Sequence, residues 1–302
     1  MIYDTIIIGA GPAGLTAAIY LRRANKSVLV LEKETFGGQI THSPKVENFP
    51  GFISVSGVEF ADKLVEQAMA QGADIDLDEA TGIIKANGIF TVRGGRCDYT
   101  ARSVIIATGS RHRTLGLANE NRFTGEGISY CAVCDGAFYK DADIAVIGGG
   151  NSALQEAILL SKTSKSVTVI QNLPFLTGES KLIEQIEASE NISVIFSSVV
   201  TKILGENSFE GITVRNEKTA EETDLTFDGI FVAIGQQPEN ESFKDTVALD
   251  ERGYITADES CVPEGESGIF VAGDCRTKAV RQIATAVSDG AAASVAVCRY
   301  LG

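Results

Sequence analysis

The strongest constraint on the fold is a βαβ pattern that occurs twice in the chain. Residues 4–32 read as an apolar strand, a glycine turn, a helix with apolar residues at a spacing of 3.6, and a second apolar strand. Residues 143–171 repeat the pattern without a gap. Two copies of a nucleotide-binding unit predict an α/β fold. We expect two Rossmann-like dinucleotide-binding domains of three ββα layers, the second inserted in the first.

The rest of the chain fits this plan. Similar strand-to-glycine segments, 102–110 and 229–238, close the two copies. Residues 58–72 read as an amphipathic helix, 192–228 as a polar β-rich meander and 281–301 as an alanine-rich helix. No low-complexity linker separates the parts. We place the domain boundaries at residues 114 and 240, so that 1–114 and 241–302 form one domain and 115–240 the central one.

Composition narrows the class of partner. The net charge of -14 over 302 residues disfavours nucleic acid and anionic membrane surfaces, since both repel a polyanion. No stretch approaches the ~20 apolar residues of a membrane span, and the chain enters its first strand without a basic leader. We therefore expect a cytoplasmic protein.

The first glycine turn predicts a dinucleotide site. Gly9, Gly11 and Gly14 form GxGxxG directly after a strand and at the start of a helix. The first glycine allows the tight turn, the second lets backbone approach a pyrophosphate, and the third packs helix on strand. Glu32 ends the second strand, where its carboxylate can accept a hydrogen bond from an adenosine ribose.

Gly273 and Asp274 lie between a predicted strand and a predicted helix near the end of the chain. A carboxylate at such a turn can bond a polyol such as a ribityl chain, although an Asp can equally serve as a helix cap there. Together with GxGxxG, this pair favours flavin adenine dinucleotide (FAD) as the ligand.

The segment YCAVCDG, residues 130–136, contains the close pair Cys131 and Cys134. A zinc site is disfavoured because the chain has two histidines and no second CxxC, so no metal site is predicted. A structural disulfide is disfavoured in a cytoplasmic protein. The remaining reading is a redox dithiol, with Asp135 beside it as proton donor or acceptor.

These motifs occur in the order seen in low-molecular-weight thioredoxin reductases, and the chain resembles that family over essentially its whole length. The matching segments are GAGPAG, GGQITHSPKVENFPG (37–51), IIATGS, YCAVCDG, GGGNSA, VAGDC and VRQIATA. The resemblance implies a homodimer that binds FAD tightly and reduces thioredoxin. By position, Cys134 would face the flavin, Cys131 would attack the thioredoxin disulfide, and Asp135 would be the general acid.

The resemblance also implies which residues bind FAD. They lie in both terminal parts of the chain: Gly9, Gly11, Pro12, Ala13, Gly14, Glu32, Gly38, Gln39, Asn48, Ala107, Thr108, Gly109, Gly273, Asp274, Arg281, Gln282 and Ile283.

The second copy departs from the family's pattern. Gln171 aligns with Glu32, and a neutral amide lacks the charge that favours an unphosphorylated ribose. NADPH-dependent members have a basic cluster of the HRR kind after this strand, but here no Lys or Arg follows until Lys181. NAD(P)H is therefore not expected. This pattern resembles the ferredoxin-dependent flavin thioredoxin reductases, in which reduced ferredoxin delivers single electrons to FAD.

Three alternatives stay open: a thioredoxin reductase that reads NAD(P)H by other residues, a flavin disulfide oxidase, and a flavin-binding scaffold. The scaffold is disfavoured because it has no need of a CxxC followed by an acid.

Charge suggests where ferredoxin docks. Residues 115–240 contain 8 Lys and Arg against 18 Asp and Glu, so an acidic ferredoxin should avoid this domain. Candidate docking cations in the other domain are Arg22, Arg23, Lys26, Arg111 and Arg113.

Overall fold

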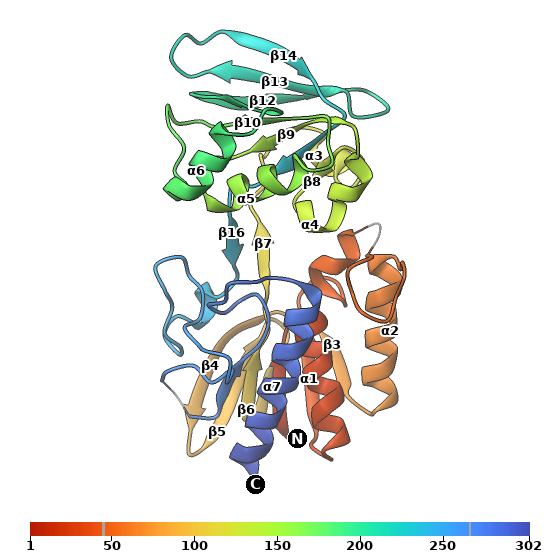
Figure 1. Ribbon diagram of the computed structural model, residues 1–302. Helices are drawn as coiled ribbons and strands as arrows, with labels where there is room; N and C mark the ends of the chain where they lie inside the picture. Colours follow the sequence, from red (N-terminus) through yellow and green to blue (C-terminus); the bar gives the residue numbers. More distant parts are fainter. Residues whose placement is uncertain (44–45, 266) are drawn as a thin grey trace. The chain divides into compact units, whose positions relative to one another are not determined.

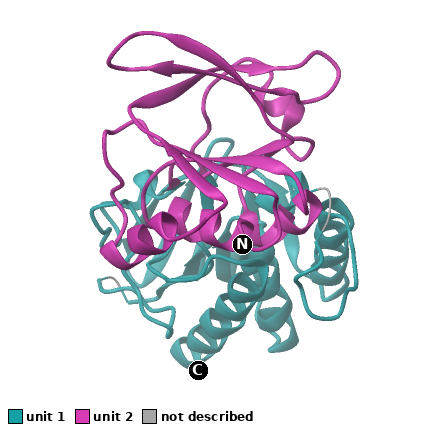
Figure 2. Cartoon of the chain, turned by 45° about the horizontal axis from the view of Figure 1, so that its top comes forward, with its two compact units in different colours: residues 1–111, 237–302 teal, residues 112–236 magenta. Residues whose placement is uncertain are grey.

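The computed structural model describes residues 1–43, 46–265 and 267–302, so that Pro44, Lys45 and Glu266 lie outside it. The described residues form two compact units, Met1–Arg111 with Gln237–Gly302 and His112–Gln236, which Figure 2 colours separately. The unit boundaries thus fall three to four residues before the expected ones at 114 and 240. The reason is local: the chain crosses between the units in two short strands, β7 (Ser110–His112) and β16 (Gln236–Pro238), which pair with each other.

Unit 1 is built on a parallel sheet of order β3-β2-β1-β6, with β17 beside the second half of β6. The first half of β6 pairs instead with the antiparallel strand β5, which pairs in turn with β4. The strands are β1 (Ile2–Ile8), β2 (Val28–Glu32), β3 (Asp74–Leu77), β4 (Ala80–Ala86), β5 (Ile89–Gly94), β6 (Asp98–Ile106) and β17 (Ile269–Val271). Helices α1 (Pro12–Arg23), α2 (Gly57–Ala70) and α7 (Ile283–Leu301) complete the unit, with the short η1 (Gly38–His42) and η3 (Glu241–Phe243) (Figure 1).

The core of unit 1 follows the two-residue period of its strands. Ile7 and Val30 face the cluster formed with α1 and α7, whereas Ile6 and Leu31 face the opposite cluster, which includes β5. Because successive strand residues point to opposite faces, one apolar strand supplies both layers of core. The result is a ββα sandwich.

Unit 2 repeats this arrangement. Its parallel sheet has the order β11-β10-β9-β15-β8, and a separate antiparallel sheet has the order β12-β13-β14. The strands are β8 (Ile128–Ser129), β9 (Asp143–Ile147), β10 (Ser166–Ile170), β11 (Ile192–Ile195), β12 (Ser198–Leu204), β13 (Gly211–Asn216), β14 (Glu222–Thr226) and β15 (Gly229–Val232). The helices are α3 (Glu120–Phe123), α4 (Ala132–Asp135), α5 (Asn151–Leu160) and α6 (Ser180–Glu187), with the short η2 (Gly136–Tyr139). The predicted fold class is confirmed.

One sequence expectation needs correction. The stretch 192–228 was expected to be a meander throughout, but β11 pairs in parallel with β10 and so belongs to the Rossmann-like sheet. Only β12 to β14 form the antiparallel meander. Periodicity alone does not separate the two, because a short apolar strand reads the same in either sheet.

Among the described residues, no helix is long and apolar enough to cross a membrane.

Candidate active site

The glycine turn of unit 1 has the geometry that its sequence predicts. Gly9 has φ 109°, and a β-carbon there would lie 2.3 Å from the carbonyl oxygen of Ala107. A β-carbon at Gly14 would lie 1.9 Å from the carbonyl oxygen of Gly9. At Gly11 the nearest atom is 3.9 Å away, so space remains beside this residue. Two glycines are thus required for packing, and the third leaves room for a ligand.

The start of α1 can receive an anion. Gly11 is its N-cap without a side-chain cap, Pro12 occupies the first turn, and Ala13 follows, buried. The first N–H groups of a helix lack partners within the helix, and the helix dipole places partial positive charge there. This end of α1 therefore suits a phosphate group.

Glu32 lies beside this turn, at the end of β2. Its Oε2 accepts a hydrogen bond of 2.8 Å from the N–H of Ala10, and its Oε1 accepts one of 3.0 Å from Glu34. Both bonds hold the carboxylate at the carboxyl edge of the sheet, where each oxygen retains a second acceptor position. The side chain can therefore still accept a ribose hydroxyl.

The segment after β2 returns to the same turn. The N–H of Gly37 donates to the carbonyl of Ala10 at 2.8 Å, and a β-carbon at Gly38 would lie 3.3 Å from the α-carbon of Gly11. Gly38 therefore belongs to the turn. Gln39 is exposed in η1, next to it. Of the matching segment 37–51, Pro44 and Lys45 lie outside the described residues.

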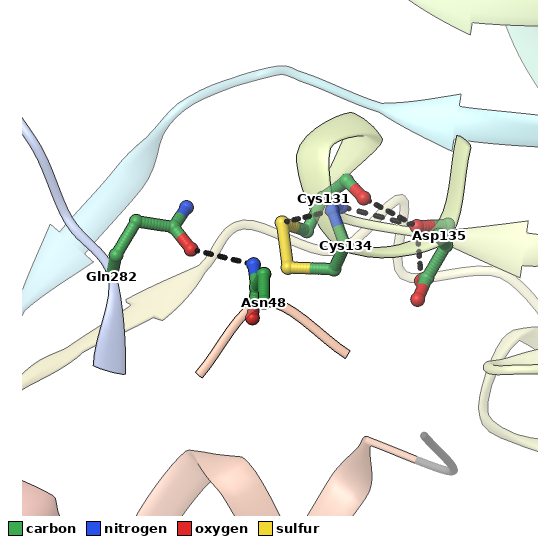
Figure 3. The surroundings of a disulfide bond; sticks show 6 residues. Asn48, Cys131, Cys134, Asp135 and Gln282 are labelled. Atoms are coloured by element: carbon green, nitrogen blue, oxygen red, sulfur yellow. Dashed lines mark hydrogen bonds between the residues drawn. A yellow bond between two sulfur atoms is a disulfide. The ribbon is translucent and has the colours of Figure 1, made fainter. Parts of the chain in front are cut away.

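Asn48 and Gln282 meet from distant parts of unit 1. The amide nitrogen of Asn48 donates to Oε1 of Gln282 at 3.2 Å (Figure 3). Gln282 also caps α7, where its side chain accepts from the N–H of Thr285 and its own N–H donates to the Thr285 hydroxyl. Ile283 is the first residue of α7.

The end of β6 adds a second edge to the site. Ala107 is buried against Gly9, and Gly109 takes a φ of 72°. Between them, the hydroxyl of Thr108 donates at 2.9 Å to the side-chain oxygen of Asn240. Asn240 is buried and donates in turn to the carbonyls of Gly253 and Cys275. Sequence reasoning missed Asn240, because nothing in the sequence signals these distant contacts.

The turn at Gly273 and Asp274, after β17, lies next to the start of α1. Gly273 has φ 85°, and a β-carbon there would lie 2.9 Å from the β-carbon of Ala13, at the start of α1. Oδ1 of Asp274 is buried and finds no hydrogen-bond partner in the described ranges. Burial raises the pKa of this carboxyl. A buried acceptor without a hydrogen bond, next to the glycine turn at the start of α1, suits the polyol chain of a dinucleotide such as FAD.

Arg281 is engaged by the protein itself. Its guanidinium donates to the carbonyls of Lys278 and Arg276 at 3.1 and 3.3 Å, and stacks 4.1 Å from the ring centre of Tyr254. These contacts stabilise the segment between Asp274 and α7. The expected contact of Arg281 with the flavin stays a prediction.

In unit 2, Cys131 and Cys134 are joined by a disulfide (Figure 3). Cys131 is the N-cap of the short α4, and its sulfur accepts from the N–H of Cys134 at 3.2 Å. Both cysteines are partly buried, whereas Ala132 between them packs into the core with α5. The pair is therefore anchored by its backbone while its sulfurs stay near the surface of the unit.

Asp135 follows the pair directly and has the environment of a proton donor. The hydroxyl of Ser129 donates to its Oδ2 at 2.6 Å, while Oδ1 is buried with no hydrogen-bond partner in the part of the chain described. Burial raises the pKa of Asp135, and the bond from Ser129 opposes this. Sequence reasoning missed Ser129; the available signal was a hydroxyl two residues before Cys131.

The second glycine turn has the same backbone as the first. Gly148 has φ 128°, and a β-carbon there would lie 2.5 Å from the carbonyl oxygen of Ala233, as at Gly9 and Ala107. Its environment differs. A β-carbon at Gly149 would lie 2.5 Å from the side-chain amide of Gln171, which is buried against this residue.

Both polar atoms of the Gln171 side chain form hydrogen bonds within the loop that follows it. Its Nε2 donates to the carbonyl of Phe175 at 3.2 Å, and its Oε1 accepts from the N–H of Asn172 at 3.1 Å. Thr177 closes the loop over the turn, with its N–H and its hydroxyl 2.8 and 3.2 Å from the carbonyl of Gly149. In unit 1 the corresponding bond is made by Gly37, which has no side chain.

The structure divides the expected docking cations for ferredoxin between the two units. Arg111 is paired with Glu34 at 2.6 Å and with Glu239 at 3.1 Å. Arg113 belongs to unit 2, because it lies beyond β7 and its N–H donates to Gly235. The other three cations lie at or just beyond the C-terminal end of α1, about 18 Å from the glycine turn for a helix of this length. Arg113 thus lies outside the domain in which it was expected. The docking of ferredoxin on these cations stays a prediction.

Known proteins identify the class to which this site belongs. Residues 3–290 match the model of the pyridine nucleotide-disulphide oxidoreductases, and the chain belongs to this family. Its relatives include the thioredoxin reductase of Bacillus subtilis, 39% identical over 99% of this chain and 95% of the relative. A 34.2 kDa protein in the rubredoxin operon of Clostridium pasteurianum is 41% identical, over 99% of this chain and 97% of the length of that protein.

Solved structures agree with these relatives. The thioredoxin reductase of Streptococcus pyogenes superposes with a TM-score of 0.94 at 40% identity, covering 99% of this chain and 98% of that one. The thioredoxin reductase of T. acidophilum gives 0.67 at 36% identity and 99% of both chains. The resemblance to low-molecular-weight thioredoxin reductases is confirmed, while the ferredoxin-dependent subtype stays a prediction.

Proposed function

We propose that this protein is a flavin-dependent thioredoxin reductase that takes its electrons from reduced ferredoxin rather than from NAD(P)H. The family, the CxxC disulfide and the site in unit 1 support disulfide reduction with FAD. The choice of donor depends on one observation: the neutral side chain of Gln171 packs against Gly149 of the second glycine turn and is followed by a loop without cations.

The choice of ferredoxin over NAD(P)H rests on the contrast between the glycine turns of the two units. In unit 1 a carboxylate, Glu32, lies beside the turn with acceptor positions to spare. In unit 2 the aligned Gln171 uses its amide to hold the loop that follows. The exposed Asn172 and Leu173 stand where NADPH-dependent members have arginines. Each missing charge-assisted bond to a 2′-phosphate removes roughly 1.5 to 3 kcal/mol of binding, so two weaken NADPH by orders of magnitude.

FAD suits a one-electron donor, because it accepts electrons singly and passes them on as a pair. The N-terminus of α1 would hold its pyrophosphate, Glu32 its adenosine ribose, and Asp274 its ribityl chain. Thr108, Asn48 and Gln282 are further residues that would contact FAD. The name of the Clostridium pasteurianum relative, which refers to a rubredoxin operon, is in keeping with an iron protein as electron source.

The CxxC would transfer the electron pair to thioredoxin. Reduction of the Cys131–Cys134 bond consumes two electrons and yields two thiols once two protons are added. The Cys131 thiolate then attacks the thioredoxin disulfide and forms a mixed disulfide, and the Cys134 thiolate displaces the reduced thioredoxin and restores the original bond. Asp135, whose pKa is raised by burial, would give up a proton to the leaving thiolate. We expect a cytoplasmic homodimer.

The test is anaerobic mixing of the FAD-loaded, oxidised protein with excess NADPH, NADH or reduced ferredoxin, with thioredoxin present and the flavin absorbance followed. The proposal expects bleaching by ferredoxin alone, with thioredoxin reduced in step. Rapid bleaching by NADPH or NADH would establish a nicotinamide-dependent reductase instead. A protein that is reduced by dithiol substrates and reoxidised by oxygen, but not reduced by ferredoxin, would be a flavin disulfide oxidase.

A further inference from the structure

A buried carboxylate in α7 has no place in the reaction described above. Asp289 is almost fully buried and accepts four hydrogen bonds. The donors are the N–H of Gly273 at 3.0 Å, two guanidinium nitrogens of Arg276 at 2.9 and 2.8 Å, and the ammonium of Lys278 at 3.0 Å. The sequence signal for this residue is a single acid in a helix whose one other charged residue is Arg299, in the last turn.

The cluster is costly to bury. The side chains of Arg276, Lys278 and Asp289 are 1%, 4% and 5% exposed. Burial acts to raise the pKa of Asp289, but the bonds from Arg276 and Lys278 outweigh it and hold that pKa below its usual range. Well-packed apolar residues often stabilise a fold as well as a buried ion pair does. Fold stability alone therefore gives little reason for three buried charges here.

The cluster does fix the turn that carries Asp274. Asp289 binds the N–H of Gly273, the residue directly before Asp274. Lys278 bridges the two acids, 3.0 Å from Asp289 and 3.7 Å from Oδ1 of Asp274. That Oδ1 is the buried oxygen for which the described residues supply no hydrogen bond. One carboxylate thus binds the backbone of the turn, and one ammonium lies in ion-pair distance of the oxygen that lacks a hydrogen bond.

The turn is also held against α1. A β-carbon at Gly290, next to Asp289, would lie 2.2 Å from the carbonyl oxygen of Ala13. The hydroxyl of Ser294, one turn further along α7, donates to the carbonyl of Ala17 at 3.1 Å. Because α7 is fixed on α1 in this way, the bond from Gly273 to Asp289 also fixes the Gly273–Asp274 turn relative to the N-terminus of α1. This is the helix end that suits the pyrophosphate.

We propose that Asp289 and Lys278 are positioning residues that hold the free oxygen of Asp274 toward the polyol chain of FAD and so determine the affinity for the flavin. The inference rests on the proposed function in one respect, the identity of FAD as the ligand. It does not depend on the electron donor.

The experiment measures the dissociation constant of FAD for the apoprotein, from the quenching of flavin fluorescence. Lys278→Met keeps the length and the apolar stem of the side chain but removes its charge. Glu259→Gln is the matched control: Glu259 pairs with the same Arg276 at 3.0 Å, but from the outside, where it is 88% exposed. We expect Lys278→Met to weaken FAD binding about tenfold or more, as expected for a lost bond to a charged group. Glu259→Gln should stay within about twofold of wild type.

Two further variants separate positioning from general stability. Lys278→Arg keeps the cation and should restore part of the affinity, while the unfolding midpoint of the apoprotein stays close to wild type in both Lys278 variants. Asp289→Asn should weaken FAD binding at least as much as Lys278→Met. If it does not fold, because two buried cations lose their partner, the Lys278 variants still decide. Unchanged FAD affinity in Lys278→Met would overturn the inference. A wild-type protein that binds no FAD would instead overturn the proposed function.

Discussion

The hydroxyl of Ser129 donates a hydrogen bond of 2.6 Å to Oδ2 of Asp135, the acid that follows the CxxC disulfide. Ser129 also accepts from the N–H of Cys131 at 3.1 Å. One hydroxyl therefore joins the acid to the first cysteine. It stabilises the charged form of Asp135, whereas burial favours the neutral form.

Removing this bond should change the pH dependence of thioredoxin reduction. Asp135 acts as an acid while it is protonated, so activity falls as the pH rises through its pKa. In Ser129→Ala the bond that lowers this pKa is lost, and the falling limb of the profile should move to higher pH. As a comparison, Asp135→Asn removes the acid itself and should lower the rate of thioredoxin reduction about 10² to 10⁴-fold. The measurement is turnover against pH with saturating donor. If the falling limb of the pH profile does not move in Ser129→Ala, Asp135 is not the group that donates the proton.

The two cysteines should behave differently when replaced singly. If Cys131 attacks thioredoxin, Cys134→Ser should form a mixed disulfide with thioredoxin that no second thiol can resolve. Cys131→Ser should form none. Non-reducing electrophoresis after mixing each reduced variant with oxidised thioredoxin gives the result. The opposite pattern would exchange the two roles.

Restoring the missing charges should restore nicotinamide chemistry. The triple variant Gln171→His, Asn172→Arg, Leu173→Arg supplies the basic cluster and releases the amide that now holds the loop. We expect NADPH to reduce its flavin at least tenfold faster than that of wild type at low NADPH concentration, with NADH unaffected, because only NADPH carries the 2′-phosphate.

A matched control is Glu184→Arg, which changes the net charge by the same amount as the triple variant but at an exposed position of α6. It should leave the NADPH rate unchanged. If the control gains as much as the triple variant, the effect is one of net charge and not of a restored site.

Much of this fold follows from the sequence, for reasons that are local. Gly9 and Gly148 were expected to form tight turns, and both take the positive φ that glycine adopts without strain. The helices and parallel strands around them follow from apolar periodicity. The unit boundaries were less accurate, because the two crossings are three-residue strands with no change in composition.

The site was only partly predictable, because its supporting bonds join residues far apart in the chain. Asn240 reaches Thr108 across 132 positions, and Ser129 reaches Asp135 from a different element. Arg111 looked like a free cation in the sequence, whereas the fold pairs it with Glu34 and Glu239. Short motifs thus predict which ligand is bound, while the residues that orient the motif become visible only in three dimensions.

Glu156 in α5 gives a last prediction, on stability. Its Oε2 is buried without a hydrogen-bond partner among the described residues, and burial raises its pKa to about 7. The ordinary value is 4.5, so between these values the folded state holds a proton that the unfolded state has lost. Stability therefore falls as the pH rises through this window, and the full cost is present above pH 7.

The change Glu156→Gln removes this cost. It should raise the free energy of unfolding by about 1 to 3 kcal/mol at pH 8. Near pH 4.5, where Glu156 is protonated in the folded state and half-protonated in the unfolded state, the gain should be only about a few tenths of a kcal/mol. Urea unfolding of the FAD-loaded protein, followed by circular dichroism because the chain has no Trp, measures both values. Glu184→Gln, at an exposed position of α6, serves as control and should change neither. An equal gain at both pH values would mean that the carboxyl is destabilising through its packing, because only an effect of its charge can depend on its titration.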